Sequence, residues 1–182
     1  MFVHLKDRAL LKISGSDAEA FLQGQLSNDI NKLDACSVQL NAYCQHQGKI
    51  LALFWVLRHE DSFFLSFPSD LLEVIKTRLQ MFIIISDVVI EDISKEYIQV
   101  GSIDETHQEA LVINEKLSLI IAEKKDINKF NMELIDLWDK VCIDSLLPEI
   151  YSITSEKLVP QMLNLDINEF GVNFSKGCYP GQ

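Results

Sequence analysis

A cysteine in a setting suited to chemistry lies in the last segment of the sequence, Lys176–Gln182, which reads Lys-Gly-Cys-Tyr-Pro-Gly-Gln. Glycines stand on both sides of Cys178, and glycine can adopt positive φ and lets other groups approach the backbone closely. The lysine two residues earlier is a cation that would favour the thiolate, which is the reactive form of cysteine. We therefore predict that Cys178 is a functional thiol and that Lys176 activates it, in preference to an ordinary buried cysteine.

A second group of polar residues, Gln25, Asn28 and Asp29, follows an apolar helical pattern. Taken alone, Asn28 and Asp29 favour a helix N-cap, because their side chains accept hydrogen bonds from the first free N–H groups of a helix. Cys44 and His46 do not indicate a metal centre, since no third ligand accompanies them. We predict no metal site and no disulfide framework.

The elements that must position these residues belong to an α+β fold with antiparallel strand groups and no regular βαβ alternation. Helices are expected over 16–26, where Ser16 and Glu19 have capping-box spacing, over 70–82, and from Asp126 to Val141. Hairpins are expected around 47–49 and 114–116, with Trp55 and Trp138 in the core. The region after Pro148 has little periodicity, so we expect a long ordered loop that packs back on the domain.

Composition excludes several classes of function. The 182 residues include 27 acidic and 16 basic ones, a net charge of -11, which argues against broad binding to nucleic acid or to anionic membranes. The first residues do not resemble a signal peptide, and the longest apolar run, 81–85, is too short to span a bilayer. We therefore expect a cytoplasmic protein with reduced thiols.

Several blocks of the sequence carry a family resemblance that covers essentially the whole chain. They are Gly15–Asp29, Gln47–Ala52, Val159–Gln161, Leu163–Asp166 and Lys176–Gln182. Together they resemble the YgfZ family of folate-binding proteins, which are relatives of the glycine-cleavage T-protein, an aminomethyltransferase. The motif Lys-Gly-Cys-aromatic-x-Gly-Gln is the most specific of them.

The resemblance implies a T-protein-like fold of two interleaved antiparallel α+β subdomains, one ferredoxin-like, around a central cavity. We expect one subdomain over 1–45 plus 145–182 and the other over 46–144. Members of the family continue past the motif with a glutamate and a C-terminal β-barrel, both absent from the printed sequence. The chain is therefore expected to be a shortened paralogue or a fragment.

The resemblance also implies a function. It indicates a tetrahydrofolate-binding accessory protein for assembly or repair of iron–sulfur enzymes, which affects tRNA modification through those client enzymes. The folate contacts it implies are Gln25, Asn28, Asp29, Gln161 and Gln182. A pterin presents paired donors and acceptors that suit amide and carboxylate groups.

One position departs from the T-protein pattern. The stretch that should contain the catalytic aspartate has Ala52 instead, so aminomethyl transfer as the T-protein performs it is not expected. Two alternatives stay open: a folate-dependent one-carbon transferase, and a degenerate scaffold without activity.

Overall fold

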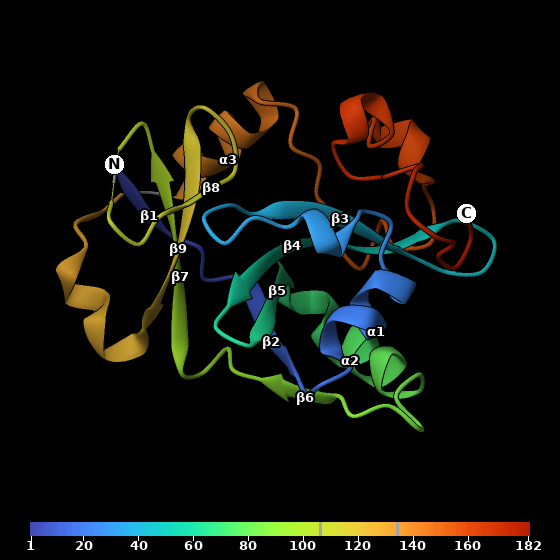
Figure 1. The fold of residues 1–182 in the computed structure, drawn as a ribbon. Coiled ribbons are helices and arrows are strands. Elements are labelled where there is room, and N and C mark those ends of the chain that lie inside the picture. Colours follow the sequence, from blue (N-terminus) through green and yellow to red (C-terminus); the bar gives the residue numbers. More distant parts are fainter. Residues whose placement is uncertain (106, 134) are drawn as a thin grey trace.

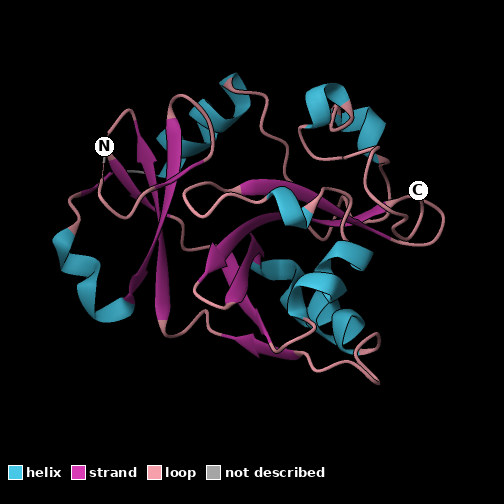
Figure 2. Ribbon diagram, in the orientation of Figure 1, coloured by secondary structure: helices cyan, strands magenta, loops and turns pink. Residues whose placement is uncertain are grey.

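The computed structural model describes residues 1–105, 107–133 and 135–182, and Leu134, part of the helix expected from Asp126, lies outside them. Ten strands and three α-helices are assigned in the described residues (Figures 1 and 2). The strands are β1 (Phe2–His4), β2 (Arg8–Ser14), β3 (Gln39–Cys44), β4 (Ile50–His59), β5 (Ser62–Pro68), β6 (Val89–Asp92), β7 (Tyr97–Ile103), β8 (Leu111–Val112), β9 (Leu117–Glu123) and β10 (Met132–Glu133). The helices are α1 (Ala18–Gln25), α2 (Leu72–Gln80) and α3 (Ile135–Asp144), with 3₁₀ turns at Ile30–Lys32, Ser69–Leu71, Lys124–Lys129, Pro160–Leu163 and Ile167–Glu169.

Two five-stranded sheets organise the chain, and we name each by its central strand. The β5 sheet has the order β3-β4-β5-β2-β6, and all of its strand pairs are antiparallel. The β7 sheet has the order β10-β1-β7-β9-β8, in which only β1 and β10 run parallel. The chain therefore starts in the β7 sheet, builds the β5 sheet and then returns. The α+β prediction is confirmed, and the division into subdomains 1–45 plus 145–182 and 46–144 stays a proposal.

The helices pack on different parts of this framework. α1 and α2 lie next to the β5 sheet, and Phe21, Leu22, Ile75 and Leu79 of these helices are buried in one core (Figure 1). α3 lies against the β7 sheet, and a Cβ at Gly101 of β7 would meet the Trp138 ring at 2.3 Å. Only glycine allows so close a contact at this position.

Three local predictions hold. A helix was expected over 16–26, and α1 spans Ala18–Gln25. The hairpins of β3 with β4 and of β8 with β9 form as expected. The Asp29 side chain accepts a hydrogen bond from the Asn31 N–H at the start of a 3₁₀ turn, which is the cap expected there.

Two other local predictions are wrong. The helix expected from Asp126 is broken, because Met132–Glu133 pairs with β1 and α3 begins only at Ile135. Phe130 and Met132 instead pack into a small core on the β7 sheet, so tertiary packing overrides the helical spacing. The capping box is also absent: the Ser16 hydroxyl donates to an Asp87 carboxylate oxygen at 2.9 Å.

The region after Pro148 is the predicted long ordered loop. It contains only 3₁₀ turns, yet Ile150, Leu165, Val172 and Tyr179 are buried in the main core. This loop brings the end of the chain beside the turn between β3 and β4 (Figure 1). β3 is buried on both faces apart from Gln39.

Candidate functional site

The thiol segment, Asn173–Gln182, is held against the β3–β4 turn by two glycines. Gly181 has φ of 82°, and a Cβ there would meet the Gln45 carbonyl oxygen at 2.3 Å and the Gly48 nitrogen at 2.5 Å. Gly48 also has φ of 82°, and a Cβ there would meet the Gly181 oxygen at 2.8 Å. Of the two glycines around Cys178, Gly181 therefore needs to be glycine, whereas a Cβ at Gly177 would meet nothing within 4 Å.

The Lys176 side chain is hydrogen-bonded to backbone carbonyls and, within the described residues, not to the thiol of Cys178. Its ammonium donates to the Gln23 carbonyl at 2.6 Å, to the Asn28 carbonyl at 2.9 Å and to the Leu26 carbonyl. The ammonium also lies 5.8 Å from the centre of the Tyr179 ring. Burial lowers the pKa of Lys176 to about 8, and the Asp29 carboxylate opposes this shift. The activation of Cys178 by Lys176 stays a prediction that this geometry does not support.

The four thiols fall into two pairs. Cys36 and Cys178 are exposed, whereas Cys44 and Cys142 are buried or half-buried. Burial raises the pKa of Cys44 and the pKa of Cys142 to about 12, so these two thiols are protonated and unreactive near neutral pH. Exposure of Cys178 is consistent with a thiol that meets reagents from solution.

The polar side chains of the loop after α1 bond mainly to β3, to α1 and within the loop. The Asn28 amide donates to the Leu40 carbonyl at 3.1 Å, and its oxygen accepts from the Asp29 N–H at 2.8 Å. Asp29 accepts from the Gln23 amide at 3.0 Å, while the Gln25 Oε1 atom is buried with no partner among the described residues. Gln25 is therefore the residue of this group with an unused polar atom.

The remaining predicted contacts, Gln161 and Gln182, are both exposed. The Gln161 carbonyl accepts from the Asn164 N–H at 3.2 Å, and the Gln182 N–H donates to the Tyr179 carbonyl at 3.3 Å. Within the described residues, neither side chain lines either of the two cavities described next.

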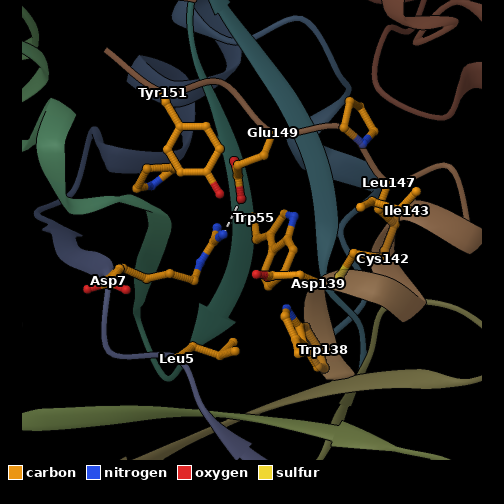
Figure 3. A pocket seen from close by; sticks show the side chains of 13 residues that line it. Leu5, Asp7, Trp55, Trp138, Asp139, Cys142, Ile143, Leu147, Glu149 and Tyr151 are labelled. Carbon is orange, nitrogen blue, oxygen red and sulfur yellow. Dashed lines mark hydrogen bonds and ion pairs between the residues drawn. The ribbon is translucent and has the colours of Figure 1, made fainter. Parts of the chain in front are cut away.

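A cavity of about 440 Å³ opens where the two sheets meet (Figure 3). Its walls come from β1–β2, β4, the end of β5, α3 and the segment after α3. The residues lining it are Leu5, Asp7, Arg8, Trp55, Pro68, Trp138, Asp139, Cys142, Ile143, Leu147, Pro148, Glu149 and Tyr151. Both tryptophans, expected in the core, are indeed buried, but they also face this cavity, with ring centres 6.0 Å apart.

An ion pair between Arg8 and Glu149 lies in the wall of this cavity (Figure 3). The Arg8 guanidinium carbon lies 3.8 Å from the centre of the Trp55 ring, a cation–π contact. Arg8 also donates from Nε to the Ser66 hydroxyl at 2.7 Å, which in turn donates to Gln99 of the β7 sheet. A buried polar chain therefore links the two sheets directly beside the cavity.

Two buried polar atoms of this wall have no hydrogen-bond partner in the described part of the chain: Glu149 Oε1 and Trp55 Nε1. Buried polar groups without partners are costly, so they are uncommon in native proteins and often mark a place for water or a ligand. Burial raises the pKa of Glu149, although Arg8 opposes the shift, and burial also raises the pKa of Asp139. The wall thus offers one indole donor and a carboxyl group that can accept or, when protonated, donate.

A second cavity, of about 360 Å³, lies between the loop after α1 and residues 168–173. Trp55 and Leu147 line both cavities, so they form the partition between them. Asn28 and Lys32 line the second cavity, together with Gln39 and Asn173. Among the predicted folate contacts, Asn28 is thus the one that reaches either cavity in the described structure.

The sequence did not predict the ion pair of Arg8 with Glu149 in the cavity wall. The partners are 141 residues apart, and neither belongs to a recognisable motif. The usable signals were weak: an arginine at the start of an apolar strand, and a glutamate directly after Pro148.

No group of three or more His, Cys, Asp or Glu side chains within the described ranges is arranged to hold a metal ion. No described helix is both long enough and apolar enough to cross a membrane.

Comparison with known proteins places the chain in a family. No protein-family model matches it. An uncharacterized protein of Haemophilus influenzae is 31% identical over 187 residues, covering 100% of this chain and 66% of that protein. The tRNA-modifying proteins YgfZ of Vibrio atlanticus and Colwellia psychrerythraea are 26% and 25% identical, covering 100% and 99% of this chain and 63% and 64% of their own lengths.

The fold has a match among solved structures. The crystal structure of glycine cleavage system aminomethyltransferase T from Bartonella henselae superposes with a TM-score of 0.56 at 13% identity, covering 79% of this chain and 45% of that one. This likeness confirms the predicted T-protein-like fold. The chain spans about two thirds of the length of the relatives it matches, and it belongs to the YgfZ family.

Proposed function

We propose that this chain is a tetrahydrofolate-binding accessory protein that supports assembly or repair of iron–sulfur enzymes and, through them, tRNA modification. The family membership and the T-protein-like fold support this proposal. So does the name of the relatives, tRNA-modifying protein YgfZ. Because the chain spans about two thirds of those relatives, the activity of the whole protein and its iron–sulfur client enzymes are part of the proposal.

The observation that carries the folate assignment is the pair of unpartnered buried atoms at the cavity, Glu149 Oε1 and Trp55 Nε1. A pterin edge presents N–H donors next to acceptor atoms, so it satisfies a carboxylate and an indole N–H together. The carboxyl group would accept from the pterin N–H groups, and the indole would donate to a ring nitrogen or oxygen. Each of these bonds removes the cost of a buried polar group left unpaired.

The shape of the cavity fits the same ligand. Volumes of 440 and 360 Å³ on the two sides of Trp55 fall in the range of small-molecule sites. Trp55 and Trp138 give flat apolar walls on which an aromatic ring system packs. Folate is a long molecule with a pterin at one end and an acidic tail at the other, so it would use both sides of the partition. Lys32 lines the second cavity, where it pairs with Glu169 at 3.7 Å, and it is the cation there that a ligand carboxylate would have to share.

The remaining residues keep the roles proposed for them from the family resemblance. Asn28 lines the second cavity, and Gln25 has an unused carbonyl oxygen, so these two are the best placed for folate. Asp29, Gln161 and Gln182 line neither cavity, so they would contact folate only where the ligand extends beyond the cavities. Cys178 is the functional thiol of the proposal.

Titration calorimetry with tetrahydrofolate tests the folate assignment. We expect binding by the wild type, and at least tenfold weaker binding by Trp55→Phe, which removes the indole donor, and by Glu149→Gln, which removes the charge. Glu73→Gln, at an exposed position of α2, is the matched control and should bind like the wild type. Absence of heat with well-folded wild-type protein would reject the assignment.

The thiol role needs a test in cells. In a strain that lacks the protein, Cys178→Ala should fail to restore the activity of iron–sulfur enzymes, whereas Cys36→Ala, at the other exposed thiol, should restore it. Full restoration by Cys178→Ala would remove the thiol from the proposal and leave folate binding untouched.

One observation favours a second candidate, a folate-dependent one-carbon transferase. Ala52 is fully buried in β4 opposite Tyr43, so no acid acts from that position. Asp139 and Glu149, however, line the cavity with raised pKa values, as general acids do. Turnover of an aminomethyl donor with tetrahydrofolate, lost in Asp139→Asn, would favour this candidate, and absence of turnover by the wild type would reject it.

A further inference from the structure

Lys176 is the most buried lysine that the structure describes, at 9% exposure, yet it has no carboxylate directly beside it. Its three hydrogen bonds all go to backbone carbonyls of the segment 23–28, which lies about 150 residues earlier in the chain. An ammonium has three donors and no acceptor, so these bonds use its full capacity. No donor is left for the Cys178 thiolate.

The three carbonyls lie at the end of α1. Gln23 belongs to the last turn of the helix, Leu26 is its C-cap residue, and Asn28 follows two residues later. The last carbonyls of a helix have no partners within it, and they carry the negative end of the helix dipole. α1 has no basic residue of its own in its last turn, so Lys176 supplies the missing cation from the other end of the chain.

A second attachment lies on the other side of the thiol. The contact of Gly181 with Gly48 fixes the segment to the β3–β4 turn, as described above. Between the two attachments, Tyr179 is buried and Cys178 is exposed. The Asn173 side chain adds support before the lysine, because its oxygen accepts from the Ser175 N–H at 2.8 Å and from the Lys176 N–H at 2.9 Å.

The thiol is also separate from the proposed folate site. Among the described residues, Cys178 and its neighbours Gly177 and Tyr179 line neither cavity. The buried groups around the ammonium are backbone carbonyls, with Asp29 as the nearby carboxylate and Tyr179 as the nearby ring. Nothing in this arrangement directs the thiol inwards.

We propose that Lys176 is a positioning residue that latches the thiol segment onto the end of α1, so that Cys178 faces outwards. The thiol is then presented to solvent and not to folate in the cavities. This inference rests on the proposed function for the role of Cys178, but the latch itself can be measured on the purified protein.

Hydrogen exchange and alkylation test the latch in a Cys36→Ser background, where Cys178 is the one exposed thiol of the four. In Lys176→Met we expect at least tenfold faster amide exchange across 173–182 and across 23–29. The pH at which the alkylation rate of Cys178 reaches half of its limiting value should stay the same as in the wild type. Lys49→Met, at an exposed lysine of the turn that the segment contacts, should leave both measurements unchanged.

Lys176→Arg separates the latch from thiol activation. Its planar guanidinium cannot place three donors as a compact ammonium does, so exchange should stay faster than in the wild type. A cation that only stabilised a thiolate would be replaceable by arginine. Unchanged exchange in Lys176→Met, or an alkylation midpoint that rises in Lys176→Met and is restored by Lys176→Arg, would overturn the proposal.

Two measurements on the wild-type protein test the proposal even if the lysine variants fold poorly. Because the latch joins the two segments, their amides should exchange with similar protection, and very different protection would contradict it. Saturating tetrahydrofolate should not slow alkylation of Cys178, and protection of the thiol by the ligand would contradict its outward role. Failure to bind folate would remove only this second measurement.

Discussion

The cavity wall and the thiol segment satisfy their polar groups in opposite ways. At the cavity, each guanidinium nitrogen of Arg8 has a partner, but Glu149 and Trp55 each keep a buried atom without a partner in the described structure. In the thiol segment, the Lys176 ammonium is saturated and the reactive group, Cys178, is exposed. The first arrangement suits a small ligand that completes the bonding, and the second suits presentation of one group to the outside.

The cavity wall and the thiol segment should therefore respond differently to substitution. Because buried polar atoms of the cavity wall have no partners, the free energy of unfolding should depend on the charges in that wall and on a bound ligand. The thiol segment depends on geometry, through one lysine and one pair of glycines in close contact. The predictions below separate these two dependences.

The largest contrast is expected between Cys142 of the cavity and Cys178 of the thiol segment. Burial raises the pKa of Cys142 to about 12, so at pH 8 its thiolate fraction is about a thousandfold below that of an ordinary cysteine. Pulse labelling with iodoacetamide, read by mass spectrometry of peptides, should modify Cys178 and Cys36 rapidly and leave Cys142 and Cys44 unmodified. Equal labelling of Cys142 and Cys178 would contradict the buried cavity wall.

Arg8→Met should give the largest loss of stability. It leaves Glu149 buried without its partner and removes the bonds to Ser66, so we expect the free energy of unfolding to fall by about 3–5 kcal/mol. Urea denaturation measures this loss. Arg58→Met, which breaks a more exposed ion pair with Glu19, should cost less than about 1 kcal/mol.

The double variant Arg8→Met with Glu149→Gln separates the charge from the packing. Because no uncompensated carboxylate remains, it should recover part of the loss seen in Arg8→Met alone. Strictly additive losses in the single and double variants would mean that the two side chains act independently, against the contact in the structure.

The sequence predicted those features that depend on neighbouring residues. The helix expected over 16–26 forms as α1, Asp29 forms a predicted cap, and the hairpins expected around 47–49 and 114–116 are present. Each is a local conformational preference, so nearby residues suffice to indicate it. The family resemblance added the T-protein-like fold, which local patterns alone do not specify.

The features that the sequence did not predict depend on contacts between distant residues. β10 is a two-residue strand that exists because β1 is there to pair with it. The bonds from Lys176 to the end of α1 join residues 148 to 153 positions apart, and the same lysine next to Cys178 in sequence suggested a different role. The cavity wall likewise assembles from residues with no pattern in common.

Gly181→Ala tests the geometric dependence of the thiol segment. A Cβ at φ of 82° is strained, and it would lie 2.3 Å from the Gln45 carbonyl oxygen, so we expect a local cost of about 1–3 kcal/mol. Hydrogen exchange of 178–182 measures it. Gly177→Ala is the matched control, since a Cβ there meets nothing within 4 Å, and it should change stability by less than about 0.5 kcal/mol.

The smallest effect is expected in the pH dependence that Glu149 contributes. Burial raises the pKa of Glu149 in the folded protein above its value in the unfolded chain, so the folded state binds this proton more tightly. The resulting stabilisation is fully present below the unfolded pKa and is lost as pH rises through the folded pKa. The stability of the wild type relative to Glu149→Gln should therefore fall as pH rises from about 4.5, the region where an ordinary glutamate titrates.

Thermal unfolding of both proteins between pH 4.5 and 8 gives this difference, because titration of the other carboxylates is common to both and cancels. Glu73→Gln, at an exposed position, should show a constant difference from the wild type. A bound ligand that donates to Glu149 Oε1 favours the ionised form, so saturating tetrahydrofolate should flatten or reverse the slope for the wild type alone. A slope that is unchanged by ligand would separate Glu149 from the folate site and leave the cavity wall as a structural ion pair.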